Sequence, residues 1–199
     1  MSAVTPFARL VGTWKIWIGT ASLAAPLLDV APSGSWIELG STDGDQEINF
    51  TGALTALSDN EHTGPRKHVR AEEGVNFKAA LAFLTLENLA KIRGLAATQT
   101  VTTTTSGTLA VKKLPNKRGY IPARYALLAR GGAVEASNTM SAYLAGPAQL
   151  WIPLGVFDSE PTEAYSKGGS PTPEFTFTAE EDTTQAAGDE MGWLMMQSS

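Results

Sequence analysis

The chain contains no cysteine and only two histidines, His62 and His68, among its 199 residues. Without cysteine there is no disulfide, no thiolate nucleophile and no cysteine-ligated metal. Two histidines are also too few for a histidine-rich metal site or for a catalytic design that uses three of them. These absences exclude several large classes of enzyme and metalloprotein.

Charge is also scarce. Charged residues make up 18% of the chain and the net charge is −5, whereas globular proteins average about 25% charged residues. A protein that grips nucleic acid by its phosphates is usually basic overall or on one face. The negative net charge therefore argues against binding nucleic acid through its phosphates, although it does not argue against nucleic acid passing nearby.

Long apolar runs are missing too. No stretch approaches the roughly 18 apolar residues of a membrane span, so we expect none. The segment LVGTWKIWIGTASLAA near the start has some character of a secretory leader, but Lys15 interrupts it. We predict instead that Thr13–Thr20 is a strand with Trp14, Ile16 and Ile18 on one face.

What the chain does contain is mostly β-strand pattern. In Glu47–Leu57, apolar residues such as Ile48 and Phe50 alternate with polar ones, which predicts a strand with one buried face. The same reasoning predicts strands at Thr13–Thr20, Glu47–Leu57, His68–Leu84, Val101–Leu114, Tyr120–Arg130, Gln149–Phe157 and Pro173–Thr178.

Glycines and turn residues indicate how these strands connect. A turn-rich stretch predicts that Leu57–His68 is the tip of a long hairpin. Gly74 is expected to mark a bulge in the second strand of that hairpin. Gly131 and Gly132 are expected to break the strand that precedes them.

One short helix is predicted at Thr85–Arg93. Thr85 can cap its start, because a threonine oxygen accepts an orphan backbone N–H. Leu86, Leu89 and Ala90 share one face at helical spacing, and Gly94 is placed to end the helix.

These elements predict a mainly β protein: a β-sandwich or barrel with one short flanking α-helix and a long hairpin loop. We expect a single domain over residues 1–199, with an N-terminal arm at about 1–12. The apolar residues around Trp193, in an acidic C-terminal segment at about 174–199, must find a partner surface.

The segment WIELGSTDGDQEINF carries three alternating carboxylates, Asp43, Asp45 and Glu47. An EF-hand calcium loop needs its glycine at the sixth position and a glutamate at the twelfth. Here the glycine is second and Leu54 is twelfth, so we predict a corner between two strands rather than a metal site. No serine elbow, phosphate loop or dinucleotide motif is present, and we expect neither an enzyme nor a cofactor.

A basic cluster, PRKHVR, places Arg66, Lys67 and Arg70 at the predicted hairpin tip. It could touch phosphate, lie in solvent, or pair with acids of a neighbouring subunit. The corner residues Asp43, Asp45 and Glu47 and the acidic C-terminal segment are available as partners. We treat these six residues as candidate subunit-interface residues.

Three segments together resemble the major tail tube proteins of long-tailed bacteriophages, a family related to type VI secretion tubes. They are WIELG with its acidic turn, the strand and helix AEEGVNFKAALAFLTLENLAKIRG, and WIP followed by EFTFTAEED. The resemblance covers roughly Thr13 to Asp182. It implies a β-sandwich that forms hexameric rings, stacked into a tube through which DNA passes without specific binding.

The resemblance therefore implies a structural virion protein, located in the tail and assembled in the host cytoplasm. Its partners would be further copies of itself and the tape-measure, tail-tip or baseplate, and tail-terminator proteins. Two alternatives remain open: another virion role, such as a head–tail connector, decoration or tail-completion protein, and a β-sandwich module that binds a ligand or carbohydrate. Trp14, Trp17 and Trp36 are the aromatic candidates for such a module.

Overall fold

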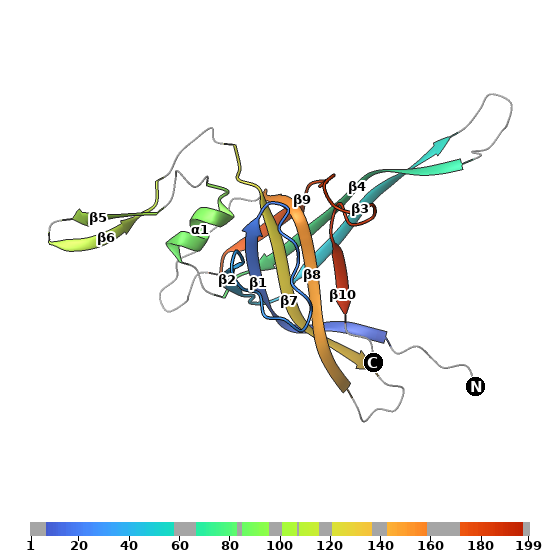
Figure 1. Ribbon diagram of the computed structural model, residues 1–199, viewed down its shortest axis with the longest axis horizontal. Helices are drawn as coiled ribbons and strands as arrows, with labels where there is room; N and C mark the ends of the chain where they lie inside the picture. Colours follow the sequence, from blue (N-terminus) through green and yellow to red (C-terminus); the bar gives the residue numbers. More distant parts are fainter. Residues whose placement is uncertain are drawn as a thin grey trace.

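A computed structural model describes residues 7–57, 67–82, 85–95, 101–106, 108–115, 121–136, 143–158 and 172–196. Within these ranges the chain forms ten strands and one short helix (Figure 1). They are β1 Phe7–Thr20, β2 Ile37–Ser41, β3 Glu47–Leu57, β4 Lys67–Ala80, α1 Leu86–Ile92, β5 Thr102–Ser106, β6 Leu109–Lys113, β7 Tyr125–Ala136, β8 Tyr143–Phe157, β9 Glu174–Ala179 and β10 Trp193–Met196. The prediction of a mainly β fold with one short helix is confirmed.

Eight of the strands form a single antiparallel sheet in the order β2-β1-β7-β8-β9-β4-β3, and β10 pairs with β8 beside this path. The described strands do not close into a barrel, so the barrel alternative is wrong. The two ends of the sheet approach each other at an isolated bridge between Thr42 and Leu81. The sheet is therefore strongly curved but open.

The main core lies on the inner face of this curved sheet. The predicted row Trp14, Ile16 and Ile18 of β1 is buried there, as the alternation of apolar residues in the sequence required. Strands from both halves of the sheet contribute to the same cluster. Its aromatic centre is on β8 and β9, where Phe157 packs edge-to-face against Phe175 and Phe177, with ring centroids 5.4 Å and 5.0 Å apart.

A second, smaller core covers the other face of the sheet. Trp17, Leu128 and Trp151 are buried here. The segment between β1 and β2 and the start of β10 cover them, through Trp36 and Trp193. Trp193 packs on Trp151 with ring centroids 5.4 Å apart, so the predicted need for a partner surface near the C-terminus is met by β8.

Buried polar groups hold the segment between β1 and β2 against this face. Gln149, fully buried, accepts a hydrogen bond from the Arg130 side chain and donates one to the carbonyl of Pro26 at 3.1 Å. Arg130 also donates to the carbonyl of Leu27 at 2.6 Å. Burial of these polar groups costs little because each has a partner.

The predicted hairpin is present. β3 pairs with β4 from Glu47 opposite Lys78 to Leu57 opposite Lys67, while residues 58–66 lie outside the described residues. The pairing shifts beside Gly74, as the bulge prediction required. Phe50 was expected on a buried face, but 69% of its surface is exposed. That expectation was wrong because β3 is the last strand in the sheet order, with no described strand on its outer side.

The predicted strand break at Gly131 and Gly132 is wrong. β7 begins at Tyr125, later than predicted, and continues through both glycines to Ala136. A Cβ atom on Gly131 would lie 2.3 Å from the indole ring of Trp14. Gly131 has no Cβ atom, so the Trp14 indole ring can pack directly over β7. Alternation of apolar and polar residues does not reveal this long-range packing requirement.

The remaining predictions differ mainly in boundaries. The threonine-rich segment Val101–Leu114 forms a two-stranded hairpin, β5–β6, in a sheet of its own. β8 begins before the predicted Gln149, at Tyr143, and β9 matches its predicted segment closely. β1 begins at Phe7, inside the region expected as an N-terminal arm.

The helix α1 forms for the predicted reasons. The Thr85 hydroxyl accepts a hydrogen bond from the Asn88 backbone N–H at 3.1 Å. Gly94 follows with a φ of +63°, a conformation that suits glycine at a helix end. Leu89 and Ala90 are buried as expected, together with Ile92. Leu86 was expected on the buried face, but it is exposed.

Candidate functional site: the acid-lined corner

The segment between β2 and β3 forms the corner that the sequence predicted. Thr42 occupies its centre and is only 3% exposed. Its hydroxyl accepts the backbone N–H of Trp14 at 2.9 Å, and its own N–H donates to the Trp14 carbonyl at 2.7 Å. The next N–H, that of Asp43, donates to the Ala80 carbonyl at 2.9 Å. The corner is thereby fastened to both β1 and β4.

The turn itself is closed by a side chain. The Gln46 amide donates to the Thr42 hydroxyl at 2.9 Å and to the Gly44 carbonyl at 2.7 Å. Gly44 has a φ of +80°, which favours glycine. This arrangement leaves the three carboxylates of Asp43, Asp45 and Glu47 on the surface.

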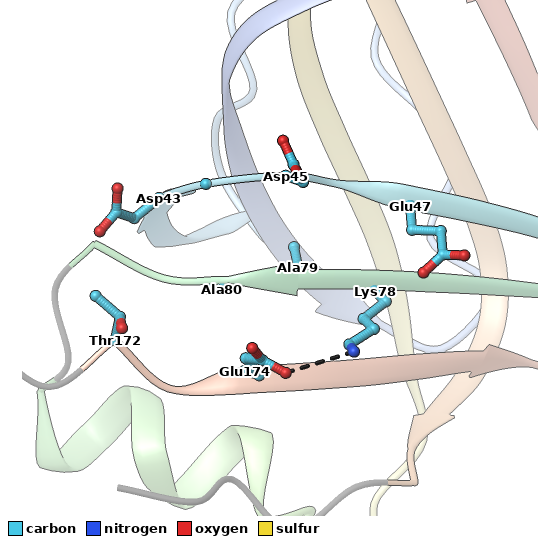
Figure 2. Close-up of a pocket in the computed structure, with 9 residues that line it drawn as sticks. Asp43, Asp45, Glu47, Lys78, Ala79, Ala80, Thr172 and Glu174 are labelled. Carbon is cyan, nitrogen blue, oxygen red and sulfur yellow. Dashed lines mark ion pairs between the residues drawn. The ribbon is translucent and has the colours of Figure 1, made fainter. Parts of the chain in front are cut away.

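These carboxylates line an open cavity of about 430 Å³. Lys78 and Ala79 of β4 and Glu174 of β9 contribute to it, and the Lys78 ammonium pairs with Glu174 at 3.4 Å (Figure 2). Its nine lining residues are Asp43, Gly44, Asp45, Glu47, Lys78, Ala79, Ala80, Thr172 and Glu174. Four carboxylates against one lysine give the cavity a negative excess.

The carboxylates do not converge on a common point. In Figure 2 the side chains of Asp43 and Asp45 point in different directions, and Glu47 lies further along β3. Over the described residues, no group of three or more acidic or histidine side chains is close enough to hold a metal ion. The geometry suits a cationic side chain or segment that spans several carboxylates better than a single ion.

The structure places part of the predicted basic cluster at the far end of the same hairpin. Lys67 pairs with Leu57 and Arg70 with Leu54 in the β3–β4 ladder, whereas Glu47 pairs with Lys78 at the other end. Arg66 lies outside the described residues. A ladder of this length spans roughly 30 Å. Along this ladder Lys67 and Arg70 are therefore far from the acidic corner of their own chain.

Sequence reasoning missed Lys78 and Glu174 as members of the site. Lys78 falls on the polar side of its strand pattern, but nothing local indicates that it faces the corner. Glu174 enters because β9 pairs with β4, with Glu174 opposite Ala80. That pairing connects residues 94 positions apart, which period-two patterning does not specify.

The tryptophans proposed for a ligand-binding surface are used in packing. Trp14 is 3% exposed within the main core. Trp17 belongs to the second core, and Trp36 packs against it. None of the three lines the acid-lined cavity.

A scan against protein-family models finds no match to the chain, and a search of curated proteins finds none either. In the part of the chain that the structure describes, no helix has the length and apolar character needed to cross a membrane.

Proposed function

We propose that the chain is a structural, non-catalytic protein that assembles with copies of itself into stacked hexameric rings forming a phage tail tube. The resemblance of its three segments to tail tube proteins is the starting point for this proposal. The resemblance implies a β-sandwich with a flanking helix and a long hairpin loop, and the mainly β fold with one short helix and the β3–β4 hairpin is compatible with it.

The single observation that carries the proposal is the extension of the β3–β4 hairpin beyond the rest of the sheet (Figure 1). β9 pairs with β4 only over Asn76–Ala80. Across the described residues, the outer edge of β3 and the edge of β4 before Asn76 have no strand beside them. Long unpaired edges are an aggregation hazard in a monomer, whereas neighbouring subunits in a ring can cover them.

The arrangement of charge also supports assembly in one direction. An acidic corner and a basic strand end at opposite ends of one hairpin favour a head-to-tail contact, which closes into a ring or continues as a filament. A chain with net charge −5 also fits a lumen that does not hold the phosphates of passing DNA.

Electron microscopy of the purified full-length protein tests the proposal. We expect rings or hollow tubes at high concentration, or after seeding with tail tips. Protein that remains monomeric under both conditions would count against self-assembly. Discrete assemblies that never stack would favour the alternative of a connector, decoration or tail-completion protein.

A further inference from the structure

The hairpin formed by β5 and β6 stands apart from the rest of the fold (Figure 1). Its two strands form a separate sheet and pair with no other described strand. Every side chain of β5 is exposed, and in β6 only Val111 is partly buried. A two-stranded hairpin without a packing surface is marginally stable in water, and among the described residues no further strand pairs with this one.

One face of the β5–β6 hairpin offers groups suited to a protein contact. Strand alternation places Leu109, Val111 and Lys113 of β6 on the same face. Thr104 lies directly opposite Val111. Leu109 is 68% exposed. This face combines an apolar row with one cation, and we call it the Leu109 face.

A salt bridge joins the opposite face of the hairpin to α1. The Lys112 ammonium pairs with the carboxylate of Glu87 in the first turn of α1. Lys112 lies on the face opposite Leu109, so this contact leaves the Leu109 face open. The hairpin projects outward from α1 (Figure 1), so its Leu109 face is placed where a second molecule can reach it.

Charge is strongly segregated along the sequence. Residues 88–134 contain no acid and eight basic residues, namely Lys91, Arg93, Lys112, Lys113, Lys117, Arg118, Arg124 and Arg130. Residues 16–65 contain no Lys or Arg and seven acids, namely Asp29, Glu38, Asp43, Asp45, Glu47, Asp59 and Glu61. The β5–β6 hairpin lies within the first segment and the acid-lined corner within the second. The hairpin itself carries Lys112 and Lys113 and no acid, whereas four carboxylates and one lysine line the corner, so the two are opposite in charge.

We infer that the β5–β6 hairpin is an arm that docks on a second copy of this chain, with the Leu109 face over the acid-lined cavity of that copy. The lining of the cavity includes the small residue Ala80, and its carboxylates exceed its one lysine. In the docked arrangement Leu109 packs beside Ala80 while Lys113 meets the carboxylates. The inference rests on the proposed self-assembly and identifies one of its contacts.

The absence of native cysteine allows a direct test by cross-linking. One preparation of the full-length protein carries Lys113→Cys and another carries Glu47→Cys, and the two are mixed, assembled and oxidised. We expect a disulfide-linked dimer, since such a bond forms when the two Cα atoms come within about 7 Å. Leu27→Cys, at a residue that is 71% exposed between β1 and β2, replaces Lys113→Cys in the control and should give no dimer above background.

A rival occupant of the cavity is the basic hairpin tip. A mixture of Arg66→Cys with Glu47→Cys tests it in parallel. Cross-linking through Arg66→Cys but not through Lys113→Cys would overturn the inference and leave the proposed tube intact.

Assembly measurements provide a second, independent readout. Leu109→Ser should raise the concentration needed for assembly roughly tenfold, the effect of losing about 1.4 kcal/mol at a contact. The matched variant Leu27→Ser should leave it unchanged. Lys113→Glu should impair assembly, and adding Glu47→Lys should restore it.

The outcomes separate the inference from the proposed function. If tubes form but the Lys113–Glu47 cross-link does not, the docking arm is refuted and the tube is not. The same holds if Leu109→Ser assembles at the same concentration as the wild type. Cross-linked particles that never become tubes support the arm and refute the tube. Absence of both refutes both proposals.

Discussion

At the scale of one residue, Thr42 fixes the acidic turn between β2 and β3. It is nearly buried, and its backbone and side chain bond to Trp14, 28 residues away. The sequence around it shows three carboxylates that resemble half of a calcium loop. The contacts of Thr42 organise the turn, and the three carboxylates lie on its surface.

A buried carboxylate beyond β9 leads to a prediction on pH dependence. Asp182 is 3% exposed. It accepts hydrogen bonds from the Thr184 hydroxyl at 2.6 Å and from the Gln185 amide at 2.8 Å. These bonds, that from Thr184 first, hold the pKa of Asp182 well below its usual range. A lowered folded-state pKa stabilises the fold above the unfolded pKa of about 3.9, and this stability is lost as the pH falls below it.

We therefore expect Asp182→Asn to destabilise the protein at pH 7 and to cost progressively less as the pH falls below about 4. Urea unfolding of both proteins at pH 7, 4 and 3 measures the difference. Equal destabilisation at every pH would show that the charge of Asp182 contributes nothing.

At the scale of single elements, α1 is the part that local sequence predicts best. Its cap and its terminating glycine act within a few residues, so pattern and physics agree. The contacts that position it are not local: the Asn88 side chain donates to the Leu39 carbonyl at 2.7 Å, and Glu87 forms a salt bridge with Lys112. The Lys112 contact lowers the pKa of Glu87.

We expect Thr85→Ala to destabilise the protein by about 1 kcal/mol, because the Asn88 N–H loses its acceptor. Thr85→Ser retains the hydroxyl and should lose much less. Chemical denaturation of the two variants measures the difference. Equal losses would mean that Thr85 acts through its methyl group.

The strand elements are less completely predictable than the helix. Alternation correctly placed β1, β4 and β9, because each has one face in the core. It failed at Phe50 of β3, where burial depends on how far the sheet reaches. The glycine signal failed at Gly131, where the Trp14 side chain crosses the strand. Local pattern encodes neither condition.

At the scale of the whole molecule, the candidate interface is divided between the two ends of one hairpin. Reversing the charges of Arg66, Lys67 and Arg70 should impair assembly without unfolding the subunit, because these residues would pair with acids of a neighbour. Electron microscopy measures assembly and circular dichroism measures folding. Reversal of Lys15 and Arg124, which pair with Glu38 and Glu180 within the chain, serves as the control.

Normal tubes from the triple variant would remove the subunit-pairing role of the basic cluster. If the wild-type protein also assembles less at high salt, an electrostatic contact is supported. Exposed charges are already screened beyond about 8 Å at physiological ionic strength, and added salt screens them further.

The sequence by itself determined the elements: strands from period two, a capped helix, a corner at an acidic turn and a chain without thiol chemistry. These depend on interactions between residues a few positions apart. Only the tertiary structure decided that the sheet stays open, that Lys78 and Glu174 join the acidic corner, and that β5 and β6 pair with no other described strand. These depend on pairings between strands far apart in sequence, where the free energy comes from burial that no local pattern records.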